Sequence, residues 1–397
     1  MEYVFSDRIR DLKGNAIREI FKALNNPNIV SFAGGLPNAS VLPAREIAEI
    51  TASLMSGDKA SEVLQYGATE GYMPLRERIA SFVSRYGIKG QTSDNVRIVS
   101  GGQQTIDLMC KAFVNKGDVV LVEDPTYLAV LHILKTYEGV AVGVKSGADG
   151  LDLEDLERKI IKYKPAMLYC VPTFSNPTGI TYSTQVREGI ARISAKYNLP
   201  VLEDDPYSEI RYEGERVPSV KSYDKEGNVV FTASFSKTIA PGLRCGYCVG
   251  EPELLNKLTI GKQAADVHSS MLSQGIIDEY MRRNLFDTNL AKAIPLYKTK
   301  KDAMIAALDR YMPGCFTHTD PRGGLFVWGE FSEESGIDTQ QAFMGACDRG
   351  VAYVSGETFF ADGLDRRHIR LNFSNASEAQ IEECMHKLGD YFKELIR

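Results

Sequence analysis

The chain has 397 residues, of which 44% are hydrophobic and 25% are charged, and its formal net charge is -6 at pH 7. This length allows two domains, each with a hydrophobic core of its own. The negative charge and the lack of a basic stripe argue against a surface that binds nucleic acid or an acidic membrane. We therefore predict a protein whose partners are small molecules.

We expect no targeting segment in this sequence. Residues 1–21 carry charges throughout and lack the apolar region of a secretory signal. No apolar run approaches the roughly 20 residues that a membrane-spanning helix needs. The seven cysteines are scattered and odd in number, which suits a reducing cytoplasm better than a disulfide framework. We therefore predict a cytoplasmic protein.

Short apolar runs alternate with helical patterns through the first two thirds of the chain. After an N-terminal segment, the sequence predicts strands at residues 95–101, 118–125, 139–144, 166–172, 199–207, 228–237 and 244–250. Strands that alternate with helices favour an α/β fold with a mostly parallel sheet covered on both faces.

The pattern changes at about Asp287. A long helical stretch, residues 289–312, is followed by mixed strands and helices that include "RGGLFVW" and "HIRLNFS". We predict a second, smaller α+β domain joined to the first by this helix. The predicted division is an N-terminal arm with part of the small domain (1–45), a large domain (46–287) and a small domain (288–397).

The pair Cys245 and Cys248, in "CGYC", has the spacing of a redox motif. The segment 244–250 is predicted to be a strand, however, and side chains three residues apart on a strand point to opposite faces. We therefore expect two buried thiols here, and we predict no metal site.

Polar residues gather where the predicted strands end. Five of the predicted strands finish in "SGGQQ" (100–104), "EDPTY" (123–127), "PTFSNPTG" (172–179), "EDDPY" (203–207) and "SFSK" (234–237). The carboxyl ends of parallel strands share one edge of a sheet, and ligands bind in the crevice there. Each cluster alone could be ordinary loop polarity, but five of them on one edge indicate a binding site.

The chemistry of these residues suits one kind of ligand. Glycines that open a helix offer backbone N–H groups to a phosphate, and Ser234, Ser236 and Arg244 can bind the same anion. The adjacent carboxylates Asp204 and Asp205 need either solvent or a cationic partner, which could be a ligand's ring nitrogen or a buried arginine. The side chains that remain are an amine, an amide in a tight turn and two aromatic rings, namely Lys237, Asn176, Tyr127 and Tyr207.

Each of these residues also has a plain structural interpretation, such as packing or backbone hydrogen bonding. As a set, they describe a site for a planar, phosphorylated, cationic heterocycle that accepts an amine. Pyridoxal phosphate fits this description, with a lysine for its aldehyde and an acid for its pyridinium nitrogen.

The sequence also resembles the class I/II aminotransferases of fold type I, which depend on pyridoxal phosphate. The matching stretches include "SFAGGLP", "LQYGATEGYMPLR", "NPTG" and "SFSKTIAPGLRCG", and they run in family order from about residue 31 to 374. The resemblance implies a large domain with a mostly parallel seven-stranded sheet between helices, together with a smaller α+β domain.

The resemblance also implies roles for single residues. Lys237 would hold the cofactor and later move the substrate proton. Asp204 would pair with the pyridinium nitrogen, and the spacing to Tyr207 favours it over Asp205. Tyr207 and Asn176 would bond the phenolic oxygen of the ring, and Tyr127 would stack on it. The phosphate would lie among Gly102, Gln103, Ser234, Ser236 and Arg244.

Two further implications concern the partner subunit and the substrate. Tyr66 would reach the phosphate of the neighbouring subunit, which makes the protein a homodimer with shared sites. Arg370 would clamp the substrate α-carboxylate, aided by Asn176 and by the backbone at Gly35. Nothing but the resemblance points to Arg370, for which a surface ion pair is the alternative.

The stretches "AIRE", "SFAGGLPN" and "EDDPY" most resemble the branch that acts on 2-aminoadipate, kynurenine and aromatic amino acids. Arg18 could there read a distal carboxylate, or it could be an exposed helical residue. We expect ping-pong transfer of an amino group from an L-amino acid to a 2-oxo acid such as 2-oxoglutarate.

Two other functions remain open. The first is a lyase or decarboxylase that uses the same cofactor, because a fold does not determine the reaction. The second is a ligand-sensing regulatory module fused to a DNA-binding domain, for which we expect no room before "SFAGGLP".

Overall fold

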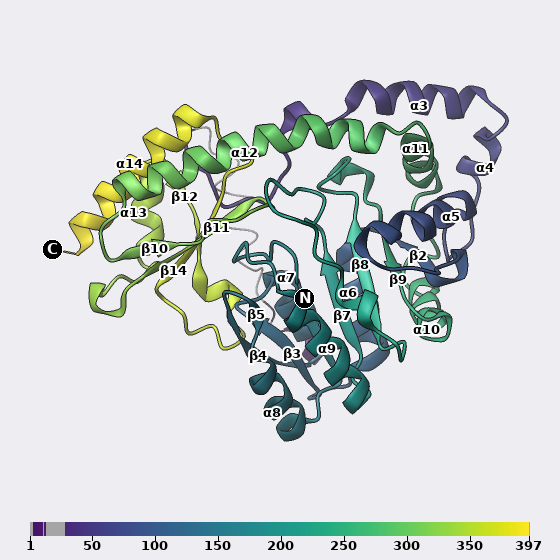
Figure 1. The fold of residues 1–397 in the computed structure, drawn as a ribbon, viewed down its shortest axis with the longest axis horizontal. Coiled ribbons are helices and arrows are strands. Elements are labelled where there is room, and N and C mark those ends of the chain that lie inside the picture. Colours follow the sequence, from purple (N-terminus) through teal and green to yellow (C-terminus); the bar gives the residue numbers. More distant parts are fainter. Residues whose placement is uncertain (1–2, 11, 13–27, 397) are drawn as a thin grey trace.

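The structure, a computed structural model, describes residues 3–10, 12 and 28–396. Its larger part is built on an eight-stranded sheet in the order β2-β9-β8-β7-β6-β3-β4-β5 (Figure 1). The strands are β2 (Val96–Val99), β3 (Val119–Asp124), β4 (Val140–Gly147), β5 (Gly150–Leu151), β6 (Met167–Cys170), β7 (Val201–Asp205), β8 (Val229–Ser234) and β9 (Gly246–Val249).

The predicted mostly parallel sheet is confirmed. Strands β4, β3, β6, β7 and β8 run parallel, while β9 is antiparallel to both of its neighbours. Each of the seven predicted strands has its counterpart in this sheet. The eighth strand, β5, was not predicted, because its two residues only turn the chain back along the end of β4.

Helices cover both faces of the large sheet, because successive side chains of each strand point to opposite faces. On β3, Val120 and Val122 pack under one helical layer, while Leu121 packs under the other. One layer consists of α6 (Gly102–Phe113), α7 (Leu128–Thr136) and α10 (Pro252–Gln263). The opposite layer contains α8 (Leu153–Tyr163), α9 (Thr184–Tyr197), α5 (Met73–Phe82) and α11 (Met271–Arg282).

A second, antiparallel sheet forms the smaller part of the molecule. Its strands, in spatial order, are β10 (Phe316–His318), β11 (Phe326–Phe331), β14 (His368–Asn372) and β13 (Val354–Ser355). The predicted long helix is α12 (Leu285–Tyr311), which runs from the large sheet to the small one and packs there on α14 (Glu378–Leu395) (Figure 1).

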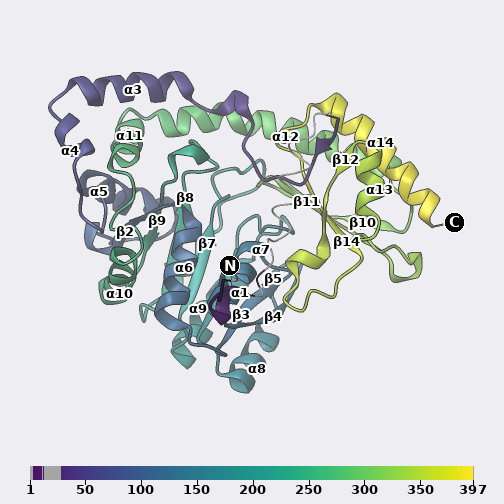
Figure 2. The same ribbon diagram turned by 180° about the vertical axis from the view of Figure 1, so that it is seen from behind.

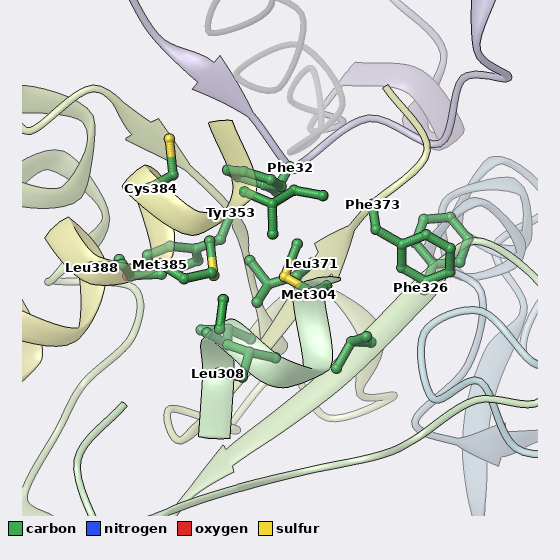
Figure 3. Close-up of a cluster of buried hydrophobic side chains, with 14 of the residues drawn as sticks. Phe32, Met304, Leu308, Phe326, Tyr353, Leu371, Phe373, Cys384, Met385 and Leu388 are labelled. Atoms are coloured by element: carbon green, nitrogen blue, oxygen red, sulfur yellow. The ribbon is translucent and has the colours of Figure 1, made fainter. Parts of the chain in front are cut away.

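The N-terminal segment joins the core of this smaller part. Strand β1 (Val30–Ser31) pairs in parallel with β12 (Val351–Ala352). Phe32 then packs among Met304, Leu371 and Met385 in the buried cluster of Figure 3. This places residues 33–36 between the two sheets. The domain boundaries at residues 45 and 287 stay a prediction.

The remaining helices lie on the outside. Figure 2 shows α1 (Asp7–Arg10) near α7, and α3 (Ala44–Ser56) alongside α11 and α12. The chain then passes through α4 (Ala60–Leu64), and α13 (Phe343–Asp348) follows β11. Within the described residues, we find no helix with the length and hydrophobicity to cross a bilayer.

The two thiols of "CGYC" lie as the strand prediction requires. Cys245 and Cys248 are both buried, and they pack in different hydrophobic clusters on opposite faces of the sheet. Among the described residues, no group of three or more His, Cys, Asp or Glu side chains is placed to hold a metal ion.

Candidate active site

A cavity of about 330 Å³ lies where the large sheet, residues 33–36 and the small sheet meet. Strands β7 and β8 end at this cavity, and α6 begins at it. Twelve of the fourteen predicted site residues line it: Gly35, Gly102, Gln103, Tyr127, Asn176, Asp204, Tyr207, Ser234, Ser236, Lys237, Arg244 and Arg370.

The start of α6 forms an anion-binding corner of the cavity. The first N–H groups of a helix have no acceptor within that helix, and here they belong to Gly102 and Gln103. Gly101 has φ +87°, and a Cβ atom at this position would lie 2.6 Å from Arg244 Nη2. A glycine at position 101 therefore lets the guanidinium of Arg244 approach the loop.

Two serines complete this corner. Ser234 ends β8, and its Oγ donates to Ser236 Oγ at 2.9 Å and accepts from Ser236 N at 3.1 Å. Arg244 Nη2 donates to Ser100 O at 3.2 Å. Helix N–H groups, hydroxyls and a guanidinium thus converge on one point, and this donor set suits a phosphate.

Asp204 supplies the acid of the cavity. It is 6% exposed, and its Oδ2 accepts from Tyr169 Oη at 2.8 Å. Burial raises the pKa of Asp204 to about 7, and repulsion from Asp205 adds to the rise. Asp205 does not line the cavity, because its carboxylate instead accepts from Ser208 N at 2.9 Å. A cation beside Asp204 would restore its ionised form.

Lys237 supplies the amine of the cavity. It follows β8 by three residues, and its Nζ donates to Gly35 O at 2.7 Å. Burial lowers the pKa of this amine to about 8, and the charges of Arg244 and Arg370 lower it further. An amine with a lowered pKa more readily provides the neutral form that attacks a carbonyl group.

Arg370 is the second guanidinium of the cavity and is only 4% exposed. Strand β14 places it so that Nη1 donates to Asn176 Oδ1 at 2.8 Å and Nη2 to Ala33 O at 2.5 Å. Its Nε is buried without a hydrogen-bond partner among the described residues. A buried guanidinium with unused donor capacity can bind a carboxylate.

Aromatic rings also line the cavity. Burial raises the pKa of Tyr127 to about 12, and burial also raises the pKa of Tyr207. The sequence interpretation missed Tyr169, which bonds Asp204, and Phe326, whose ring lies 4.4 Å from the Arg370 guanidinium. The one signal for Tyr169 was a polar ring inside the apolar run "AMLYCVP".

One predicted residue that the structure describes, Tyr66, does not line the cavity. Tyr66 follows α4, is 82% exposed, and lies edge to face with His268 at a centroid distance of 5.7 Å. A single chain therefore does not bring Tyr66 to the site. Arg18 lies outside the described residues.

The residues present fit pyridoxal phosphate. The donor-rich corner matches a phosphate, the amine of Lys237 matches an aldehyde, and Asp204 matches a protonated ring nitrogen. The fit at Asp204 is the most specific, because this buried carboxylate has a hydroxyl partner and a raised pKa in the protein alone. A cationic ring nitrogen beside Asp204 would offset the free-energy cost of burying this carboxylate.

Comparison with known proteins agrees with this chemistry. The model of the family "Aminotransferase class I and II" matches residues 38–388. Aromatic-amino-acid aminotransferase 1 of Thermococcus litoralis is 38% identical, over 99% of this chain and 95% of that protein. The 2-aminoadipate transaminase of Thermus thermophilus is 35% identical, over 97% of this chain and 95% of that protein.

A solved structure shows the same fold. The kynurenine aminotransferase of Pyrococcus horikoshii, in complex with PMP, superposes with a TM-score of 0.93 at 36% identity, covering 98% of this chain and 97% of that one. The chain therefore belongs to the class I and II aminotransferases, which transfer amino groups with pyridoxal phosphate as cofactor.

Proposed function

We propose that this aminotransferase moves the amino group of an L-amino acid to a 2-oxo acid such as 2-oxoglutarate, in two half-reactions at the cavity around Lys237. The observation that carries the proposal is the convergence of Lys237, Asp204 and the α6 anion corner on one cavity. Pyridoxal phosphate supplies an aldehyde for the amine and a ring that accepts the electrons of the Cα–H bond.

The phosphate corner orients the cofactor. In our proposal, the N–H groups of Gly102 and Gln103, the hydroxyls of Ser234 and Ser236, and the guanidinium of Arg244 hold the phosphate. Asp204 keeps the ring nitrogen protonated, because burial disfavours its ionised form and a cation beside it favours that form. Tyr207 and Asn176 bond the phenolic oxygen, and Tyr127 stacks on the ring.

Lys237 moves the proton. Its amine holds the cofactor between turnovers, and the incoming amino acid displaces it. The lowered pKa of Lys237 supports its role as the base that takes the proton from the substrate Cα. Its Nζ then carries this proton to the cofactor, and the second half-reaction runs the same steps in reverse.

Arg370 binds the substrate α-carboxylate. Among the described residues the Nε of Arg370 has no hydrogen-bond partner, and the side chain is buried. Both observations support this role, and Asn176 and Gly35 line the same cavity. An anion is expected to bind strongly here, since it also relieves the desolvation that lowers the pKa of Arg370 to about 10.

The working unit in this proposal is a homodimer in the cytoplasm that acts in amino-acid metabolism. The exposed ring of Tyr66 supports a shared site, because it is available to reach a partner's phosphate. Seven free cysteines support a reducing compartment. We keep the domain division at residues 45 and 287, and we propose neither a nucleic-acid nor a membrane partner.

The donor is proposed to be 2-aminoadipate or an aromatic amino acid, as the names of the relatives suggest, or glutamate. The test is a panel of amino donors with 2-oxoglutarate as acceptor, or with a different 2-oxo acid when glutamate is the donor, repeated with Arg18→Ala. If Arg18 reads a distal carboxylate, the variant loses activity with dicarboxylic donors and keeps it with aromatic ones. An equal loss for both classes would contradict that role.

The same panel tests the alternative of a lyase or decarboxylase. Transamination requires an acceptor, so omission of 2-oxoglutarate should stop turnover after the first half-reaction. Continued product formation without any 2-oxo acid would favour the alternative.

A further inference from the structure

The loop that carries Asn176 is buried along its length, since residues 171–179 are all buried. A buried loop must satisfy its polar groups inside the protein. It does so partly by folding back on itself: Ser175 N donates to Ile180 O at 2.9 Å, and Tyr182 N donates to Pro172 O at 2.8 Å. These bonds shape the loop, but they do not attach it to the large sheet.

Glu123, the penultimate residue of β3, provides such an attachment. It is 2% exposed, and its Oε1 accepts from Val171 N at 3.2 Å and from Ser175 Oγ at 3.1 Å. Its Oε2 is hydrogen-bonded to Tyr182 Oη. One carboxyl group on β3 thus holds the start of the loop, the residue next to Asn176 and the segment that follows the loop.

The partners of Glu123 in these bonds are neutral groups. Burial raises the pKa of Glu123 to about 8, so the carboxyl is protonated at neutral pH. Its contribution to the loop therefore depends on hydrogen-bonding geometry and not on charge. A glutamine, which has nearly the same shape, keeps an oxygen acceptor and is expected to serve in its place.

The placement of Asn176 matters for two binding tasks. Its Oδ1 accepts from Arg370 Nη1 at 2.8 Å, so its Nδ2 is the group left to donate to the cofactor. A shift of the loop would disturb both contacts together. We propose that Glu123 is a positioning residue, which holds Asn176 through Ser175 so that one amide serves the cofactor and Arg370 at once. The proposal rests on the function proposed above.

The expected effect can be read from the colour of the holoenzyme. An N–H donor stabilises the ionised phenolic oxygen of the cofactor, so its loss raises the pH at which the bound cofactor changes its absorbance. We expect a rise of about one pH unit. The KM for the amino donor should rise about 5-fold, because Arg370 loses its hydrogen bond to Asn176.

Three variants of the cofactor-loaded enzyme test this proposal. Ser175→Ala removes one bond of the network and should raise the absorbance midpoint by about half to one pH unit. Glu123→Leu should shift it at least as far, whereas Glu123→Gln should stay within about 0.3 unit of wild type. If Glu123→Leu does not fold, Ser175→Ala still decides.

The matched control is Ser194→Ala. Ser194 is as buried as Ser175, and its Oγ donates one hydrogen bond, to Leu199 O at 2.6 Å, in α9 and away from the cavity. The Ser194→Ala variant should lower the melting temperature as Ser175→Ala does. It should leave the absorbance midpoint of the cofactor and the KM for the amino donor unchanged. Equal midpoints for the two serine variants would overturn the proposal, as would a Glu123→Gln shift as large as that of Glu123→Leu. A wild-type protein without a cofactor absorbance band would instead contradict the proposed function.

Discussion

The cavity has two halves of different origin, the cofactor half and the carboxylate half. The cofactor half contains the α6 corner, Asp204 and Lys237, which all lie at the ends of strands of one sheet or shortly after them. The carboxylate half joins Arg370 on the small sheet to Ala33, 337 residues away in the chain. Parallel topology alone assembles the first half. The second depends on how two distant segments of the chain pack against each other.

The largest expected effect is in the cofactor half. Lys237→Ala should lower the transamination rate at least ~10⁴-fold, because it removes the amine that holds the cofactor and moves the proton. The absorbance band of the lysine-bound cofactor, at the edge of the visible range, should disappear as well. Both are measured by steady-state kinetics and absorbance, with the exposed Lys257→Ala as control. Full turnover of Lys237→Ala would remove this residue from the mechanism.

A change in the carboxylate half should leave the cofactor in place. Arg370→Lys keeps the charge but loses the two-pronged donor geometry, so kcat/KM for amino donors should fall about 10²–10³-fold. Cofactor affinity, measured by fluorescence titration of the apoenzyme, should change less than about 3-fold. Arg367→Lys is the control, since Arg367 pairs with Glu330 outside the cavity. If Arg370→Lys instead weakened cofactor binding and left the KM for amino donors unchanged, the two halves would not have separate roles.

The phosphate corner should show the reverse pattern. Ser236→Ala removes one hydroxyl donor and should weaken cofactor affinity about 10-fold. The KM for the amino donor, measured at saturating cofactor, should stay the same. The prediction fails if the amino acid KM rises and cofactor affinity does not change.

The smallest expected effect is on the pH dependence of the stability that the cofactor adds to the protein. The folded protein raises the pKa of Asp204 from its usual 3.8 to about 7. The fold therefore favours the protonated acid, and the apoprotein loses stability as pH rises from about 4 to 7. In the holoenzyme, a cationic ring nitrogen beside Asp204 stabilises the ionised carboxylate and so prevents this loss of stability. The difference in melting temperature between holoenzyme and apoprotein should thus grow by about 5 °C from pH 5 to pH 8.

Asp204→Asn provides the control for this measurement. Asparagine does not titrate, so its melting-temperature difference should change little over the same pH range. A wild-type difference that is constant or shrinks with pH would show that Asp204 has no cationic partner in the holoenzyme.

The same contrast explains what could be predicted from the sequence. The strands of the large sheet, the polar clusters at their ends and the anion corner were predicted, because each is a local pattern of strand, loop and helix. Asp204 and Asp205 could not be separated from the residues alone. Only the register of β7 turns one carboxylate into the cavity and the other toward Ser208.

The carboxylate half was out of reach of local patterns. Arg370 and Gly35 came from the family resemblance, since nothing near them in the sequence marks a cavity. Phe326 and Tyr169 were missed because apolar strands give no sign of which residue meets a ligand. The Glu123 network also escaped notice, because a glutamate in "EDPTY" looks like an exposed loop residue and is in fact buried.

The most direct test of the central claim is to trap the cofactor on the protein. The holoenzyme is treated with borohydride, which reduces the bond between the cofactor and its lysine, and is then digested for peptide mass spectrometry. The account predicts the pyridoxyl modification on the peptide that contains Lys237. Modification of a different lysine, or of none, would contradict it.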